Sequence, residues 1–262
     1  MADITAPLSV PAIAAALGGT ACRFDIDLLA ECGSTNAELL VRAGHGAPSG
    51  TVIVAERQTT GRGRMGREWI AAPGDSLAFS QLWRFPAGTN LSGLSLAVGV
   101  AVARALQKVG AGDTALKWPN DILRDGGKLG GILIELQSAT AAVIGIGLNL
   151  RLPDAMPDEV RATAAALDLP VDPNALLATV FAELLAVLDA FAVTGFAALR
   201  DEWLARHAWT GRPVRVGSPH AAPLDGICAG VAEDGALLLE TSGGTQRILS
   251  GDVSLRLMER WG

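Results

Sequence analysis

The pattern of hydrophobic residues changes near Trp209, and this change constrains the fold more than any other feature of the 262-residue chain. Beyond it, short apolar runs recur at regular spacing, separated by turn pairs such as Asp234-Gly235 and Gly243-Gly244. Short strands at such spacing are typical of a small β-barrel. The pattern predicts strands over residues 213–216, 226–231, 236–240, 245–249 and 253–257.

The part of the chain before Trp209 has a mixed pattern. β-Branched and aliphatic runs predict strands, and apolar stretches of helical length predict helices. We expect strands over 23–29, 51–55, 76–83, 128–136 and 141–150, a short strand ending at 117, and helices over 35–44, 91–109, 173–191 and 194–207. Thr35 with Glu38 fits a capping box, and Asp172-Pro173 fits an N-cap followed by a first helical proline.

Length and composition bound the class of protein. At about 150 residues per domain, the length favours one large domain and one small one, and we predict an α+β domain over residues 1–208 and a β domain over 209–262. Hydrophobic residues make up 50% of the chain and the net charge is −6, which argues against a disordered chain and against a general nucleic-acid coat. The apolar run at 10–17 is too short for a signal peptide or a membrane span.

The cysteines and histidines are few and scattered. Three cysteines without a C-x-x-C unit support neither a disulfide framework nor a zinc ribbon, and three dispersed histidines argue against a histidine-rich metal site. Because unpaired cysteines are typical of a reducing compartment, we expect a soluble cytoplasmic protein.

A glycine- and arginine-rich segment lies in the long polar loop expected over residues 57–75. Its sequence from Gln58 is QTTGRGRMGR, and Arg57 brings the arginines to four within eleven residues. Arginine forks bind phosphate and carboxylate oxygens, and the glycines let a ligand approach the backbone. The loop is therefore a candidate anion site, with a solvated surface loop or a nucleic-acid contact as alternatives. It is not a Walker P-loop, because no G-K-[ST] occurs.

Two further motifs carry polar residues at strand ends. KWPND at 117–121 ends a strand, and Lys128 opens the apolar strand that begins KLGGI. Lys128 either points into a site or extends to solvent beside the strand. In GIGLN at 145–149, the glycines either admit a flat ligand or serve packing, and Asn149 supplies an amide.

Together these motifs resemble the bacterial biotin–protein ligases, the biotin–[acetyl-CoA-carboxylase] ligases. The likeness covers about residues 24–150 closely and 209–258 more loosely; its units are Ser34-Thr35-Asn36, the Gln58–Arg67 loop with Trp69, KWPND, KLGGI, GIGLN and the tail motifs GALLLE and GDVSLR. The resemblance implies a catalytic domain with a mixed sheet flanked by helices, related to class II tRNA synthetases, and an SH3-like C-terminal barrel. Only about 23 residues precede the first strand, so it also implies the monofunctional type without a DNA-binding domain.

The resemblance further implies a two-step reaction. Biotin and ATP form biotinoyl-5′-adenylate, and a lysine of a biotin carboxyl carrier domain then takes the biotinoyl group. By analogy Lys128 and Arg64 are catalytic. The implied biotin site is Ser34, Thr35, Asn36, Gln58, Gly61, Arg62, Gly63, Arg64, Lys128 and Gly130. The implied ATP site is Arg62, Arg64, Arg67, Trp69, Lys117, Asn120, Lys128 and Asn149, with Asp121 helping to place Mg²⁺.

The same resemblance sets the expected partners and the alternatives. We expect a monomer or weak homodimer that binds neither DNA nor membranes. Ala37 follows Ser-Thr-Asn where some relatives carry a larger polar residue, so position 37 has no assigned role. A lipoate or octanoate ligase of the same fold is the first alternative, and a non-catalytic RNA- or nucleotide-binding protein is the second.

Overall fold

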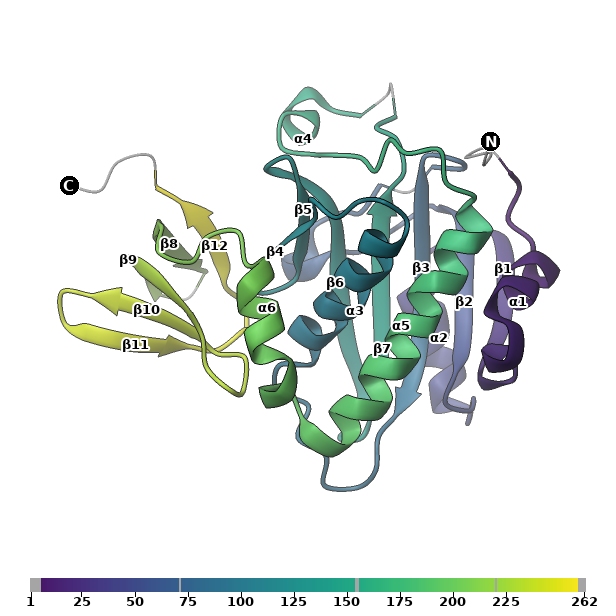
Figure 1. The fold of residues 1–262 in the computed structure, drawn as a ribbon, viewed down its shortest axis with the longest axis horizontal. Coiled ribbons are helices and arrows are strands. Elements are labelled where there is room, and N and C mark those ends of the chain that lie inside the picture. Colours follow the sequence, from purple (N-terminus) through teal and green to yellow (C-terminus); the bar gives the residue numbers. More distant parts are fainter. Residues whose placement is uncertain (1–5, 71, 154–155, 220, 259–262) are drawn as a thin grey trace.

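Two sheets organise the molecule (Figure 1). The computed structural model describes residues 6–70, 72–153, 156–219 and 221–258. The larger sheet has seven strands in the order β1-β2-β3-β7-β6-β5-β4, with β1 and β2 parallel and the other neighbours antiparallel. Its strands are β1 (Asp25–Cys32), β2 (Thr51–Gln58), β3 (Ser76–Arg84), β4 (Ala115–Lys117), β5 (Asp121–Arg124), β6 (Gly127–Ser138) and β7 (Ala141–Asn149).

Helices cover both faces of this sheet. Helices α3 (Leu94–Lys108) and α5 (Pro173–Thr194) pack against each other on the face toward the viewer in Figure 1, where α1 (Val10–Leu17) also packs on α5. Helix α2 (Thr35–Gly44) covers β2, β3 and β7 on the opposite face. The prediction of a mixed sheet flanked by helices is therefore confirmed.

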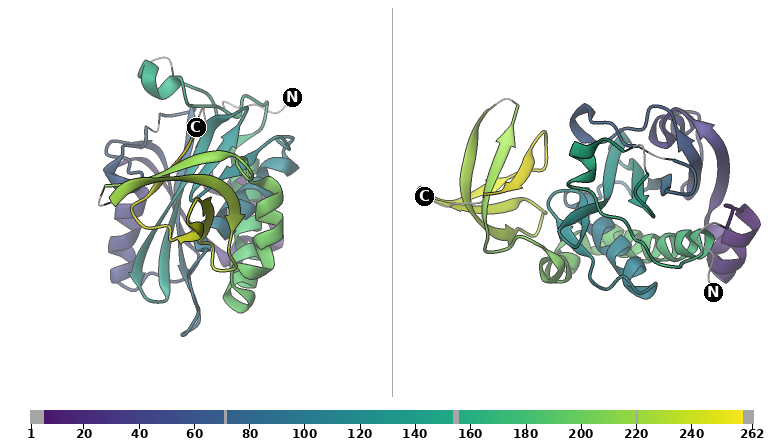
Figure 2. Two further views of the ribbon diagram at one scale, coloured as in Figure 1. Left: turned by 90° about the vertical axis from the view of Figure 1, so that its left-hand side faces the viewer. Right: turned by 90° about the horizontal axis from the view of Figure 1, so that it is seen from above.

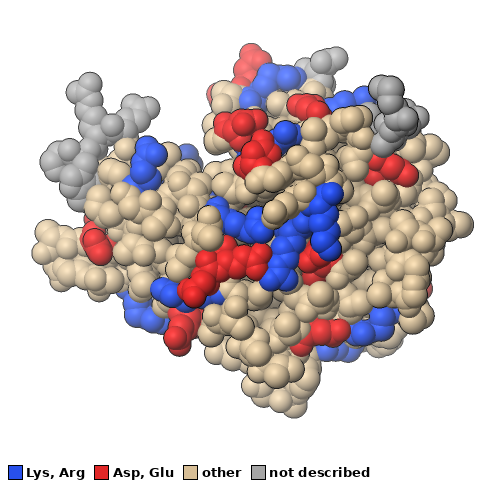
Figure 3. All heavy atoms as spheres, in the orientation of Figure 1, with Lys and Arg blue, Asp and Glu red and all other residues tan. Residues whose placement is uncertain are grey.

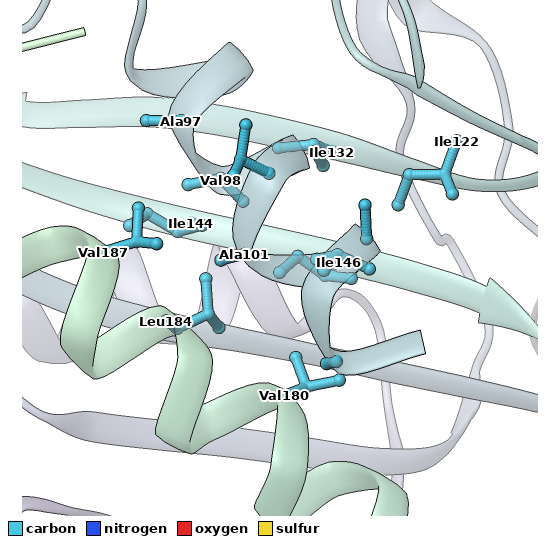
Figure 4. Packing of buried hydrophobic residues seen from close by; sticks show 14 of the residues in the cluster. Ala97, Val98, Ala101, Ile122, Ile132, Ile144, Ile146, Val180, Leu184 and Val187 are labelled. Carbon is cyan, nitrogen blue, oxygen red and sulfur yellow. The ribbon is translucent and has the colours of Figure 1, made fainter. Parts of the chain in front are cut away.

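The core lies between the sheet and the pair α3 and α5, as Figure 4 shows. Every residue of β7 is buried, because helices cover both of its faces. Helix α5 is long and apolar enough to cross a membrane by length and composition, but 56% of its most apolar window is buried inside the protein. We therefore describe α5 as a core helix.

The C-terminal part forms a five-stranded antiparallel sheet in the order β11-β10-β9-β8-β12, seen at the left of Figure 1 and at the left of the right-hand view in Figure 2. Its strands are β8 (Pro213–Ser218), β9 (Ala221–Val231), β10 (Leu237–Thr241), β11 (Gly244–Ile248) and β12 (Ser254–Leu257). Helix α6 (Arg200–Arg206) precedes this sheet, and the indole Nε1 of Trp118 donates to the carbonyl of Gly235 at 3.0 Å, joining the two sheets.

The structure differs from the sequence predictions mainly at short elements. Three elements had no predicted counterpart. Strand β5 and helix α4 (Asp158–Arg161) are very short, and the apolar run that forms α1 was considered only as a targeting segment. The first strand begins two residues later than expected, and α3 begins at Leu94 instead of 91. The helix expected over 194–207 is interrupted, because Gly195 has a positive φ and a 3₁₀ turn over Ala197–Leu199 precedes α6.

Candidate active site

A cavity of about 1050 Å³ opens between the larger sheet, the arginine-rich loop and the C-terminal sheet. It brings together residues that lie far apart in the sequence. The predicted site residues that line it are Ser34, Thr35, Asn36, Gln58, Arg62, Gly63, Arg64, Arg67, Trp69, Lys117, Asn120, Asp121 and Lys128. Among the residues that the structure describes, the predicted Gly61, Gly130 and Asn149 do not line it.

One end of the cavity holds a buried network of short polar side chains. Gln58 Oε1 accepts from the backbone N–H of Thr35 at 2.8 Å and lies 3.2 Å from its hydroxyl. Ser80 Oγ lies 2.7 Å from Thr35 Oγ1 and 2.5 Å from Asn36 Oδ1. These groups are fixed before any ligand arrives. Sequence reasoning missed Ser80, which stands in an apolar strand without a motif.

The beginning of α2 differs from the predicted capping box. The helix begins at Thr35 with Ser34 in the N-cap position, and no side chain caps it. Instead of reaching back to the N-terminus, Glu38 accepts from Arg42 Nε at 3.2 Å, one helical turn onward. The Thr35 N–H is satisfied by Gln58 from β2, so a tertiary contact replaces the local cap.

The glycines of GIGLN make room for the protein's own side chains. A Cβ on Gly145 would overlap the amide of Asn36, and a Cβ on Gly147 would overlap the indole of Trp69. The indole therefore lies directly on β7, and its Nε1 is buried without an acceptor among the described residues. Both glycines therefore have a packing role, and both also line the cavity.

Gly61 and Gly130 also have packing roles. A Cβ on Gly61 would overlap the carbonyl of Trp69, and a Cβ on Gly130 would lie 2.6 Å from the carbonyl of Gly147. The first glycine lets the loop pair with itself, and the second lets β6 approach β7. Each supports the site from outside the cavity.

Three charged residues from KWPND and KLGGI meet at the other end of the cavity. Asp121 Oδ1 lies 2.6 Å from Lys128 Nζ, and Oδ2 lies 3.0 Å from Lys117 Nζ. Burial by itself would raise the pKa of the Asp121 carboxyl, but the two lysines more than offset it and hold the pKa below its usual value. Lys117 Nζ also lies 4.8 Å from the ring centroid of Trp209, a residue outside the predicted site.

Asn149 lies behind Lys128, although sequence analysis expected it to face a nucleotide. Its side chain is buried and its amide donates to the carbonyl of Lys128 at 3.3 Å and of Ala165 at 3.0 Å. The segment at 163–165 also pairs with the Lys128 backbone. The Lys128 N–H donates to the Thr163 carbonyl at 2.7 Å, and the Ala165 N–H donates to the Lys128 carbonyl at 2.8 Å. Asn149 therefore holds the backbone that carries the lysine.

The arginine-rich loop folds back on itself and reaches the C-terminal sheet. Trp69 N–H donates to the Gly61 carbonyl at 2.9 Å, which closes the loop at its base. Arg64 donates to Asn120 Oδ1 at 3.0 Å, to the Ser250 carbonyl at 3.0 Å and to the Gly251 carbonyl at 2.5 Å. Burial lowers the pKa of the Arg64 guanidinium, against the effect of nearby carboxylates.

Several residues of the C-terminal sheet line the cavity, and sequence reasoning had assigned them no role. Arg256 on β12 is among them, together with Ser254 and Leu257. A second cavity of about 640 Å³ lies between the loop, β6 and residues 250–252. The GDVSLR motif by itself predicts no role for these residues, because nothing in its spacing indicates which face of a short strand turns toward the other domain.

Comparisons with known families agree with this organisation. The model of the biotin/lipoate A/B protein ligase family matches residues 34–149, and that of the biotin protein ligase C-terminal domain matches residues 210–256. The first match spans the predicted site motifs from Ser34 to Asn149, and the second spans most of the five-stranded sheet.

Similar proteins match over most of the chain. The biotin–[acetyl-CoA-carboxylase] ligase of Mycobacterium tuberculosis is 37% identical over 87% of this chain and 88% of its own length. The corresponding ligase of Paracoccus denitrificans is 37% identical over 86% of this chain and 98% of its own length. The structure of the Aquifex aeolicus biotin protein ligase in complex with biotin and ATP is 31% identical, with a TM-score of 0.80 over 89% of this chain and 99% of its own. The chain therefore belongs to the biotin/lipoate A/B protein ligase family, as a biotin protein ligase.

Proposed function

We propose that this protein activates biotin with ATP as biotinoyl-5′-adenylate and transfers the biotinoyl group to a lysine of a biotin carboxyl carrier domain. The observation that supports this most strongly is the two-ended cavity. Hydroxyl and amide side chains around Thr35 and Asn36 line one part of it, Lys117 and Lys128 line another, and Arg62, Arg64 and Arg67 of the loop lie on the same wall. Such a cavity suits a ligand with an uncharged polar head and an anionic end.

The neutral end is the proposed site for the ureido group of biotin. Ser34, Thr35, Asn36 and Gln58 offer short hydroxyl and amide groups, which match the N–H and C=O groups of a urea. Because Thr35 is held by Gln58 and Ser80, and Asn36 by Ser80, Leu133 and Glu135, these two side chains lose little conformational entropy when the ligand binds. Arg62 and Gly63 of the loop lie on the cavity wall and complete this part of the proposal.

The cationic end is the proposed site for the biotin carboxylate and the ATP phosphates. Lys128 and Arg64 are the proposed catalytic residues, with Lys117 and Arg67 as further cations. Arg62, already assigned to the biotin end, is proposed to serve both ligands. Asn120 and Trp69 lie on the same wall, so an amide and an indole are available to a nucleotide. For Asn149 we propose the positioning of Lys128, because its own amide is engaged by two carbonyls.

The chemistry explains the need for these charges. In the first step a carboxylate oxygen attacks the α-phosphorus and pyrophosphate leaves. In the second step a lysine amine attacks the activated carbonyl, AMP leaves and the amine loses a proton. Two anions must meet in the first step, so fixed cations that neutralise them lower the barrier by alignment and electrostatic stabilisation.

Magnesium accompanies ATP in this proposal. Mg²⁺ prefers oxygen ligands and commonly combines one or two carboxylates with substrate phosphates. Asp121 lines the cavity beside Lys117 and Lys128, the proposed phosphate ligands, and its carboxylate is already shared by these two lysines. Among the described residues there is no cluster of three histidine, cysteine or acidic side chains. Phosphate oxygens would therefore provide most of the ligands, with Asp121 as the protein's contribution.

The alternatives fit the molecule less well. A lipoate ligase would share the family of residues 34–149, but the C-terminal match is to a biotin protein ligase domain. A nucleic-acid-binding protein would need a continuous basic surface, whereas basic and acidic groups are interspersed on the face in Figure 3.

A cytoplasmic location is also part of this proposal. The three cysteines are free thiols, which supports it.

The test is direct transfer to a carrier domain. The protein is incubated with biotin, ATP and Mg²⁺ and a purified carrier domain, and the intact mass of the carrier is measured. We expect the addition of one biotinoyl group, lost when ATP is omitted or when the acceptor lysine is replaced by arginine. A parallel reaction with lipoate that lipoylates the carrier, in the absence of biotinylation, would favour the first alternative. If the carrier gains neither group, the protein is not a ligase for this carrier.

A further inference from the structure

Glu135 on β6 lies where the arginine loop meets the buried polar network, and it belongs to none of the motifs. A single oxygen, Oε2, accepts from two groups. Asn36 Nδ2 lies 2.8 Å away and Arg62 Nη2 lies 3.1 Å away. The side chain is 28% exposed, so both contacts form in a partly desolvated place at the edge of the second cavity.

The contact with Asn36 decides which way the Asn36 amide points. Its NH₂ group faces two acceptors, the Glu135 carboxylate and the Leu133 carbonyl at 3.2 Å. Its oxygen accepts from Ser80 Oγ at 2.5 Å. Turning the amide over would place the Asn36 oxygen against two acceptors. The ionised carboxylate is the stronger and nearer of the two, so it contributes most to this orientation.

The contact with Arg62 ties the loop to β6. Arg62 is 73 residues from Glu135 in sequence, and its guanidinium is 44% exposed. The backbone of Arg62 pairs with Glu68 across the loop, so its side-chain contact restrains the whole turn. Because the pair is partly exposed, a ligand anion in the adjoining cavity can compete for the guanidinium at modest cost.

We propose that Glu135 is a positioning residue that orients Asn36 for biotin and holds Arg62 beside the biotin site until ligand binds. The proposal rests on the proposed function, because biotin is the ligand whose binding it affects. It places Glu135 outside direct contact with substrate: the carboxylate acts through Asn36 and through Arg62. The shared oxygen predicts that substitutions of Asn36 and Arg62 are coupled through Glu135.

The first test is the steady-state kinetics of biotin-dependent ATP–pyrophosphate exchange for Glu135→Ala and Glu135→Gln. We expect Glu135→Ala to raise the KM for biotin about tenfold, the scale of one charge-assisted hydrogen bond, with kcat and the KM for ATP within about twofold. Glu135→Gln keeps an acceptor for Asn36 and should show a smaller rise. A general structural defect would instead lower kcat, raise the KM for both biotin and ATP, and lower Tm.

A matched control is Glu31→Ala. Glu31 also pairs with an arginine of the same region, Arg57 at 3.4 Å, but on the exposed edge strand. We expect this variant to keep the wild-type KM for biotin. The second test is the binding of biotin alone by calorimetry, which does not depend on turnover and should show the same loss for Glu135→Ala.

The third test is a double-mutant cycle between Asn36→Ala and Arg62→Ala. We expect their effects on biotin binding to be non-additive in the wild-type background and additive when Glu135 is alanine. A KM for biotin in Glu135→Ala within about twofold of wild type, or additivity in both backgrounds, would overturn this role. Failure of the proposed function looks different, because the wild-type protein itself would then show no biotin-dependent exchange.

Discussion

Lys128 Nζ lies 2.6 Å from Asp121 Oδ1, and this pair holds the ammonium at the cationic end of the cavity before any ligand is present. Asp121 shares its other oxygen with Lys117, so neither lysine extends freely into solvent. An anionic substrate would have to draw Lys128 from this carboxylate. The pair therefore pre-positions the lysine in a site whose dielectric is lower than that of water.

The first prediction concerns Lys128→Ala. We expect adenylate formation to fall at least about a hundredfold, because the variant loses a fixed positive charge where two anions must meet. Pyrophosphate exchange and thermal denaturation are measured together. The control is Lys108→Ala, which removes an exposed lysine that pairs with Glu183 on the helical face. Near-normal exchange by folded Lys128→Ala would refute the assignment.

The second prediction concerns Arg64→Gly. Arg64 connects the loop with Asn120 and with the carbonyls of Ser250 and Gly251. Without it we expect adenylate to form, since Lys128 and the polar network remain, but to escape and acylate lysines of bystander proteins. The measurement is a blot for biotin on added albumin. Arg57→Gly, on the strand outside the cavity, serves as control, and equal labelling by wild type, Arg57→Gly and Arg64→Gly would show that Arg64 does not retain the intermediate.

The third prediction concerns protection of the loop by ligands. Ordering a backbone costs roughly 1–2 kcal/mol per residue, and the loop carries glycines at 61, 63 and 66. We expect trypsin to cut at Arg62–Arg67 in the free protein and much more slowly with biotin and ATP bound. The cleavage sites are read by mass spectrometry. If cleavage is equally fast in both states, the loop does not close over the ligands.

The fourth prediction concerns Gly147→Ala. The new methyl group would overlap the indole of Trp69, which must then leave its place on β7. We expect a loss of stability of about 1–3 kcal/mol together with weaker ATP and biotin binding. Gly44→Ala, where no atom lies within 4 Å of the added group, is the control.

A double variant makes the fourth prediction specific. Trp69→Ala in the Gly147→Ala background removes the steric conflict, so the two losses of stability should be less than additive. Additive losses of Tm would mean that the methyl group disturbs another part of β7.

The fifth prediction concerns pH and His207, whose ring is stacked on Trp203 with centroids 4.5 Å apart. Burial lowers the pKa of His207 from 6.5 to about 4. The unfolded chain therefore takes up a proton between these values while the folded protein does not. The contribution of His207 to the free energy of unfolding should be fully present above about pH 6.5. It should be lost as the pH falls toward 4, by about 3 kcal/mol for this group.

The measurement is Tm against pH for wild type and His207→Phe. Phenylalanine keeps the stacking but has no nitrogen to protonate, so the variant should show a shallower decline below pH 6.5. Parallel curves would show that His207 does not contribute to the acid sensitivity.

The elements that the sequence predicted well are long and strongly patterned. Strands β2, β3 and β7 and helices α2, α3 and α5 lie within a few residues of their predicted bounds. Predominantly apolar runs of strand or helix length mark all of these elements except α2, which is marked by one apolar face. Helix α1 was missed because an apolar run of eight residues is ambiguous without its partner α5, on which it packs. The capping box at Thr35 was wrong because Gln58, 23 residues away, supplies the acceptor instead.

The sequence by itself determined most of the long strands and helices, the change of architecture near Trp209 and the set of polar motifs from Ser34 to Lys128, since these depend on the local hydrophobic pattern and residue type. The layers were expected only because the motifs resemble a known family. Only the tertiary structure decided which of those polar groups meet. Arg62 reaches Glu135 across 73 residues and Arg64 reaches Gly251 across 187, while Asn149 turns behind Lys128. Such contacts depend on strand register and on how the two sheets pack, and no local propensity encodes either.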